Sequence, residues 1–254
     1  MSHRDNCTTL PNGRHSLTGA GLALGALDGR YKSATETLVD YLSEAALNRD
    51  RVHVEVEWFI YLCDHSVLPG LSPLTDAQRD GLRAIVTEFT EESALELAEI
   101  EAVTVHDVKA VEYFIGRRLE ALGLAHLTPL VHFGCTSEDI NNLSYALGIK
   151  DAVTNVWLPA ARGLVDQIMK LAEEAREVPM LSRTHGQPAT PSTLGKELAV
   201  FAYRLNRQIK QVENAEFLGK INGATGTYSA HTVAVPGADW QRISEDFVTG
   251  LGLD

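Results

Sequence analysis

The stretch that decides the fold is PSTLGKELAVFAYRLNRQIKQVENAEFL, residues 191–218. Its apolar residues follow one another at steps of 4, 3, 4, 4 and 3, namely Leu194, Leu198, Phe201, Leu205, Ile209 and Val212. This spacing is close to a heptad seam and predicts one helix of about 27 residues, roughly 40 Å long. Such a seam has to lie against other long helices, and the sequence offers one obvious neighbour. We therefore expect an apolar stripe that this chain does not cover by itself.

That neighbour lies just upstream. Pro159 is suited to the first turn of a helix, whose apolar stripe runs from Leu164 to Ala175. Pro179 ends this helix, and we expect a loop between it and the seam. After the seam the chain enters a Gly-rich stretch and stops at Asp254 with the predicted bundle incomplete.

Shorter helical patterns precede the two long ones. The segment VHVEVEW, residues 52–58, alternates apolar and polar residues as a strand does. However, Val52, Val56 and Phe59 also share one face of a helix, and no turn residue separates them from the helical pattern that begins at Thr35. We therefore predict a helix here.

Three further helices are expected before the bundle. Thr75 is a candidate N-cap for the first, and the acidic residues 91–101 are expected to form the solvated face of the second. The third carries apolar residues from Val108 to Leu119 and ends near Gly123, and residues 129–136 follow as a loop. The pattern predicts an all-α chain: a flexible leader (residues 1–25), a small helical N-terminal domain (26–125) and the first part of a long-helix bundle (126–254).

Composition excludes several classes of protein. The 254 residues contain 22 Lys and Arg against 34 Asp and Glu, a net charge of −12, which disfavours a nucleic-acid partner. No run of 18 apolar residues occurs, so we expect no membrane span. The three cysteines, Cys7, Cys63 and Cys135, are scattered, which fits a reducing cytoplasm and neither a disulfide framework nor a zinc site.

Two histidines are candidates for acid–base chemistry. His185 lies between two prolines among hydroxyl and amide side chains, where an imidazole can act as acid or base; position alone favours the other reading, a surface histidine in a connecting loop. In His106-Asp107 a carboxylate can orient an imidazole, or Asp107 can simply cap a helix. Position alone settles neither pair of readings.

Other polar residues are candidates for holding an anion. Thr136 and Ser137 offer hydroxyls and backbone N–H groups at a helix start, or an ordinary capping box. Arg30, followed by Tyr31, can clamp a phosphate. The glycines of KINGATG, residues 220–226, allow a close approach to a ligand or a plain turn. No P-loop, dinucleotide fingerprint, HExxH or GxSxG motif is present.

Longer strings go further than spacing does. The chain contains TVHDVKAVEYF (104–114), TSEDINN (136–142), LSRTHGQPATPSTLGKE (181–197) and GKINGATGTYSAH (219–231), preceded by DGRY at 28–31. These strings, in this order and spacing, resemble adenylosuccinate lyases of the bacterial type, in the fumarase/aspartase superfamily. The resemblance extends from about residue 26 onward. Fumarase, aspartase and argininosuccinate lyase are not expected to share the DGRY and HDVKAVEY strings.

The resemblance implies a cytoplasmic homotetramer with a core of long helices, in which three subunits share each active site. It implies β-elimination of fumarate from adenylosuccinate, giving AMP, and from succinylaminoimidazole carboxamide ribotide in purine biosynthesis. It implies no cofactor and no metal. Apart from copies of the chain itself, the expected partner is the small nucleotide substrate. Another fumarate-releasing lyase of the superfamily, and a non-catalytic helical nucleotide-binding or scaffold protein, remain the alternatives.

The resemblance also assigns roles to the candidate residues. His185 is the expected general acid, and Thr136 and Ser137 are expected to bind the succinyl part of the substrate. Arg30 and Tyr31 are expected to bind the nucleotide phosphate. His106 and Asp107 are expected to orient the substrate. Lys109 and Thr184 are expected to make secondary contacts.

The sequence departs from the family in three places. Val105 stands where close relatives carry Asn, and Thr227 and Ser229 also replace the usual Asn. The mobile loop that supplies the family's serine base, Gly-Ser-Ser followed by Met-Pro and Lys-x-Asn-Pro, does not occur among the 254 residues. We therefore expect a truncated, N-terminal portion of the enzyme that is inactive alone.

Overall fold

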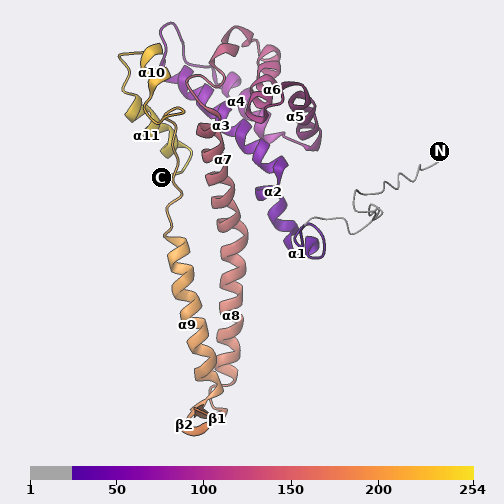
Figure 1. Ribbon diagram of the computed structural model, residues 1–254, viewed down its shortest axis with the longest axis vertical. Helices are drawn as coiled ribbons and strands as arrows, with labels where there is room; N and C mark the ends of the chain where they lie inside the picture. Colours follow the sequence, from indigo (N-terminus) through magenta and orange to yellow (C-terminus); the bar gives the residue numbers. More distant parts are fainter. Residues whose placement is uncertain (1–24) are drawn as a thin grey trace, which may run out of the picture. The chain divides into compact units, whose positions relative to one another are not determined.

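The computed structural model describes residues 25–254 (Figure 1). The predicted leader, residues 1–25, and Cys7 within it lie outside the described residues apart from Gly25. The described residues divide into two compact units, residues 25–40 and 41–254. In the first, α1 (Lys32–Thr35) and a 3₁₀ turn, η1 (Glu36–Leu38), lead into α2 (Val39–Leu42), which crosses the unit boundary.

The second unit is helical except for one hairpin. Its elements are α3 (Glu44–Asp64), α4 (Asp76–Thr87), α5 (Glu91–Thr104), α6 (Asp107–Ala121), the 3₁₀ helix η2 (Ala125–Leu130), α7 (Ser137–Ala152), the π-helical η3 (Val153–Trp157), α8 (Leu158–Glu174), β1 (Pro179–Thr184), β2 (Gln187–Thr193), α9 (Leu194–Glu213), α10 (Ser229–Ala234) and α11 (Trp240–Gly250). Among the described residues, no helix is both long and apolar enough to cross a bilayer.

Helix α3 is central to the second unit because it is buried on two faces. Val52, Val56 and Phe59 join a hydrophobic cluster with α4, α5 and α6. Val54 and Trp58 join a second cluster with α7 and α11. Burial on both faces accounts for the strand-like alternation of this segment, and the helix predicted here is confirmed. Helix α3 thus belongs to both clusters. The domain boundary expected between residues 125 and 126 stays a prediction.

The first long helix begins earlier than predicted. Pro159 lies in the first turn of α8, as predicted, but α7, η3 and α8 follow one another without a break, so the helical rod already begins at Ser137. Proline has no backbone N–H to donate to the preceding helical turn. It is tolerated here because the turn before it is π-helical, with the Leu158 N–H bonded to the Val153 carbonyl, which changes the hydrogen-bond pattern at that point.

The loop predicted between the long helices is a β-hairpin. Strands β1 and β2 pair antiparallel, with Thr184 opposite Gln187. The two residues between them, His185 and Gly186, have φ values of 50° and 74°. Two successive left-handed residues match the twist of a tight hairpin, a turn that the proline-rich sequence conceals. This small sheet is the exception to the all-α prediction.

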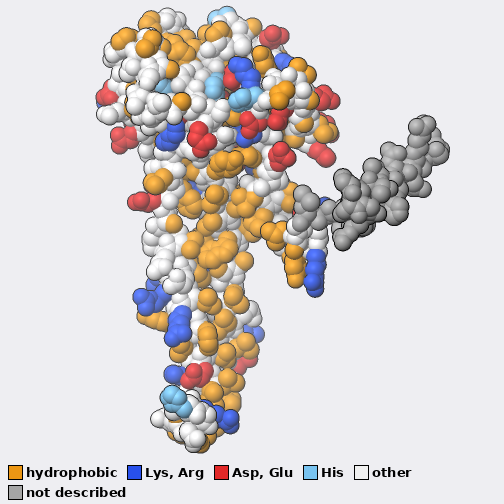
Figure 2. All heavy atoms as spheres, in the orientation of Figure 1, with side chains coloured by type: hydrophobic (Ala, Val, Ile, Leu, Met, Phe, Trp, Pro, Cys, Tyr) orange, Lys and Arg blue, Asp and Glu red, His pale blue; other side chains and the backbone are white. Residues whose placement is uncertain are grey.

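Helix α9 confirms the seam, although it is shorter than predicted because the hairpin occupies residues before Leu194. Helices α8 and α9 lie side by side (Figure 1). On α9 only Gly195, Ala202 and Ile209 are buried, whereas Phe201 is 58% exposed. On α8, Leu164 is 54% exposed. Hydrophobic side chains consequently cover the surface of this helix pair (Figure 2), and the uncovered apolar stripe is confirmed.

Candidate active site

The first helical turns of α6 and α7 bring two of the predicted residues together. His106 is the N-cap of α6, and its Nδ1 accepts the backbone N–H of Lys109 at 3.2 Å. Nδ1 as an acceptor places the proton of the neutral ring on Nε2. Nε2 lies 3.5 Å from Oγ of Ser137, the first residue of α7. The reading of Asp107 as the cap is wrong, because the imidazole itself caps the helix.

Asp107 instead forms an ion pair with Arg51 of α3. The Nη2–Oδ2 distance is 2.6 Å, and the Arg51 side chain is only 7% exposed. Burial would raise the pKa of Asp107, but the Val108 N–H and the Arg51 charge together hold it below its ordinary value. Arg51 also donates to Asn141 of α7 at 2.9 Å. One buried guanidinium therefore ties the start of α6 to α7.

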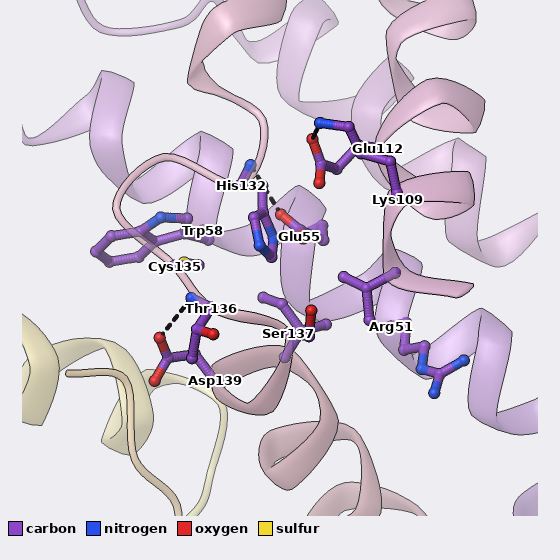
Figure 3. A network of polar contacts seen from close by, with 12 residues as sticks. Arg51, Glu55, Trp58, Lys109, Glu112, His132, Cys135, Thr136, Ser137 and Asp139 are labelled. Atoms are coloured by element: carbon purple, nitrogen blue, oxygen red, sulfur yellow. Dashed lines mark hydrogen bonds and ion pairs between the residues drawn. The ribbon is translucent and has the colours of Figure 1, made fainter. Parts of the chain in front are cut away.

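Lys109 is engaged within its own helix. Its ammonium lies 2.7 Å from Oε2 of Glu112, and this hydrogen bond raises the pKa of Lys109 (Figure 3). The ammonium stays charged, and Glu112 engages one of its three N–H donors.

Thr136 and Asp139 form the capping box that the sequence suggested. The Thr136 N–H donates to Oδ2 of Asp139 at 2.8 Å (Figure 3). Asp139 is fully buried and also accepts from Lys220 Nζ at 2.8 Å and from the Gly223 N–H at 3.1 Å. The capping box thus fastens the Gly-rich segment 219–231 beneath the start of α7.

A second buried pair escaped the sequence analysis. Glu55 of α3 is fully buried, and its Oε1 lies 2.5 Å from Nδ1 of His132 (Figure 3). Burial raises the pKa of Glu55. Burial would lower the pKa of His132, but the hydrogen bond and charge of Glu55 reverse this and raise it. The available signal was Glu55 itself, a charged residue one helical turn after Arg51 and between Val54 and Val56.

The structure does not bring all predicted residues together in one copy of the chain. Thr184 ends β1 and His185 forms the hairpin turn, beyond the far end of α8 from Ser137 (Figure 1). The 38 helical residues from 137 to 174 span about 57 Å at 1.5 Å per residue. Arg30 and Tyr31 belong to the first unit, where the guanidinium lies 5.3 Å from the phenol ring centroid.

Cys135 directly precedes Thr136, and Val105 directly precedes His106. Burial raises the pKa of the Cys135 thiol well above its ordinary value, so the thiol stays protonated and is a poor nucleophile. Val105 follows α5 with φ of 51°, a left-handed conformation that Asn tolerates better than a β-branched residue does. This backbone conformation gives a physical reason for the Asn expected at this position.

A family model described as "Lyase" matches residues 29–253 of this chain. The chain belongs to this lyase family. The chain is 49% identical to the adenylosuccinate lyase of Haemophilus influenzae over 232 residues, which is 91% of this chain and 51% of the relative. It is 48% identical to that of Vibrio cholerae over 234 residues, with the same coverage. The chain therefore spans about half the length of the curated relatives it matches.

Solved structures support the same fold. The chain resembles a fumarate lyase from Mesorhizobium sp. BNC1 with a TM-score of 0.68 at 19% identity, over 86% of this chain and 48% of the other. It resembles a β-carboxy-cis,cis-muconate cycloisomerase from Acinetobacter calcoaceticus with a TM-score of 0.67 at 18% identity and the same coverage. The long-helix architecture predicted from the seam is thus the fold of these two solved structures.

Proposed function

We propose that this chain supplies part of the active site of an adenylosuccinate lyase. The observation that carries the proposal is the pairing of His106 with Ser137 at two adjoining helix starts, in a chain half identical to adenylosuccinate lyases. The reaction is a β-elimination: a base removes a proton from the carbon beside a carboxylate, the C–N bond breaks, and an acid protonates the departing nitrogen. The products are fumarate and AMP.

Each group has a place in this scheme. Thr136 and Ser137 offer hydroxyls and helix N–H groups to the succinyl carboxylate, whose negative charge grows as the proton leaves. His106, with its proton on Nε2, donates from the same side, and Arg51 holds its neighbour Asp107 in place. Besides the Arg51 guanidinium, the Lys109 ammonium is a second positive charge, on α6. A succinylated aminoimidazole ribotide presents the same succinyl group and is the second proposed substrate.

His185 is the proposed general acid, with Thr184 beside it, and Arg30 and Tyr31 are proposed to hold the nucleotide phosphate. Because a helical rod separates the hairpin of His185 from Ser137 in one copy, the proposed site is built from more than one copy. The exposed apolar surface of α8 and α9 supports this assembly, for which we propose a homotetramer. The free thiols of Cys63 and Cys135 fit a cytoplasmic location.

The proposed mechanism needs a base that the 254 residues do not contain in recognisable form. In the resembled family a serine in a Gly-Ser-Ser loop removes the proton, and no such string occurs here. By the same resemblance the reaction uses neither a metal nor a cofactor. We therefore expect residues 1–254 alone to bind nucleotide poorly and to show no turnover.

The test joins residues 1–254 to the half of the Haemophilus influenzae relative that this chain does not match. Loss of adenylosuccinate is followed by absorbance for the joined protein and for the 254-residue chain alone. The intact mass of the latter sample is first checked to be 27.7 kDa. We expect the joined protein to cleave and the chain alone not to. His185→Ala should lower turnover by ~10²–10⁴ while leaving substrate binding largely intact.

Two results would contradict the proposal. A joined protein that has the relative's helical content and oligomeric state, yet cleaves nothing, would exclude the assigned activity. Turnover by the chain alone that disappears in His185→Ala would show that the base lies within residues 1–254.

A further inference from the structure

We propose that Glu55 is a positioning residue for the Thr136–Ser137 segment. It holds the preceding loop, residues 131–136, in the turn that delivers Thr136 and Ser137 to the start of α7. The inference rests on the proposed function in one respect only, namely that this segment binds a dicarboxylate. Glu55 itself does not touch the ligand in this scheme and acts through His132.

The contact between Glu55 and His132 uses both carboxylate oxygens. Oε2 accepts the backbone N–H of His132 at 3.0 Å, and Oε1 lies 2.5 Å from the ring Nδ1 (Figure 3). The backbone of His132 has φ of 61°, the left-handed region that a non-glycine residue rarely adopts. One carboxylate therefore holds the main chain and the ring of a residue whose own preference is to leave this turn.

The restraint is passed along the loop by further contacts. Trp58, one turn after Glu55 on α3, donates its Nε1–H to the carbonyl of Phe133 at 2.9 Å. The N–H of Cys135 donates to the carbonyl of His132 at 3.1 Å. Thr136 comes next, held from the other side by Asp139. The loop is thus fixed by α3 before Thr136 and by the capping box after it.

The surroundings of the pair explain why its acceptor is a buried carboxylate. The charged groups that act on His132 are Glu55 of α3 and Glu112 and Lys109 of α6. A backbone N–H and a ring N–H, both donors, converge on one point, and a carboxylate is the side chain that accepts at both oxygens. A buried carboxylate is tolerated when its hydrogen bonds are satisfied, as they are here.

The isosteric substitution Glu55→Gln breaks this arrangement selectively. Glutamine has one acceptor oxygen and one donor nitrogen, so it can keep the bond from the His132 backbone N–H but meets Nδ1 with a donor. The ring then has to move its proton from Nδ1 to Nε2 to keep the contact, and the charge-assisted bond to the carboxylate is lost. Glu57→Gln is the matched control. Glu57 lies two residues further along α3 and pairs with Arg83 of α4, with Oε1 at 2.7 Å from Nε, on another face of the helix.

The experiment uses the 254-residue chain and fumarate as the probe, followed through the backbone amide signals of Thr136 and Ser137 by NMR. We expect fumarate to shift these signals in the unchanged chain and in Glu57→Gln. In Glu55→Gln the apparent Kd should rise at least tenfold, and the signals of residues 132–137 should move before any ligand is added. Core amide exchange should show that the fold is kept.

The outcomes separate the two ideas. Binding and amide positions in Glu55→Gln equal to those of the control would overturn the positioning role. If fumarate does not shift the amide signals of Thr136 and Ser137 in the unchanged chain, the proposed dicarboxylate site is refuted. The positions of the amide signals without ligand still test the positioning role of Glu55. If Glu55→Gln does not fold, Glu55→Gln combined with His132→Gly continues the test, because glycine takes the left-handed turn freely. Since that glycine relieves the backbone restraint, a double variant that folds no better than Glu55→Gln alone would overturn the proposal.

Discussion

Gly163 and Gly195 predict opposite effects for the same substitution, because they differ in what lies around them. Both are helical, Gly163 in α8 and Gly195 in the first turn of α9. A Cβ built on Gly163 meets nothing within 4 Å. A Cβ on Gly195 would lie 2.3 Å from the carbonyl oxygen of Ala172 and 2.5 Å from Cα of Arg176. Gly195 is therefore the point where the two helix backbones touch.

The magnitudes follow from these contacts. Alanine in a helix interior is about 1 kcal/mol more favourable than glycine, so Gly163→Ala should stabilise the chain by roughly that amount. At Gly195 the clashing atoms belong to the backbone and cannot rotate away, which places the cost near the upper end of ~1–3 kcal/mol for overpacking. Separating the helices also weakens the hydrogen bond from the Gly195 N–H to Ala175, at 3.0 Å, by about 1 kcal/mol.

We expect the two variants to differ by about 5 kcal/mol, with Gly163→Ala above the unchanged chain and Gly195→Ala below it. Urea unfolding followed by far-ultraviolet circular dichroism measures this difference, since most of the signal comes from helices. Equal slopes of the transitions would show that the same surface unfolds in each variant. Stabilisation by both substitutions would refute the close backbone contact at Gly195.

Three further predictions concern single residues. Burial raises the pKa of Asp50 to about 6, so the stability that the neutral carboxyl provides is complete below about pH 4 and is lost as the pH rises through 6. At ~1.4 kcal/mol per pKa unit, Asp50→Asn should stabilise the chain at pH 7 by up to about 3 kcal/mol. The melting temperature should therefore rise at pH 7 and stay unchanged at pH 4. Val105→Asn should stabilise the chain by about 1 kcal/mol in urea, since the exposed valine at φ 51° contributes strain and no burial, and a lower midpoint would contradict that. Gly134→Ala should destabilise by about 3 kcal/mol, since φ is 74° and the Cβ would lie 2.8 Å from the His231 ring, whereas Gly237→Ala, with nothing within 4 Å, serves as the neutral control in thermal melting.

The glycines also show why such effects cannot be read along the chain. Gly163 and Gly195 are both flanked by good helix formers, and nothing in their local sequence separates a free position from a backbone contact. The difference arises only when α8 and α9 pack together. The same holds for Pro159, whose sequence context suits a helix start, although the π-helical turn before it lets the helix continue.

Local spacing was enough to predict helices α3 to α6, the N-cap at Thr75 and the apolar stripe of α9, because a helix is held by bonds between residues four apart. Helices α10 and α11, which follow the Gly-rich stretch, were not predicted. The strings around His106, Thr136 and His185 were likewise enough to indicate the lyase family. The arrangement of the candidate site was not contained in such local patterns. Glu55 meets His132 across 77 residues and Arg51 meets Asp107 across 56, so these pairs exist only after α3 has packed against α6 and the 131–136 loop. Charged residues in an apolar run are compatible with many partners, and only the tertiary packing that excludes water selects one.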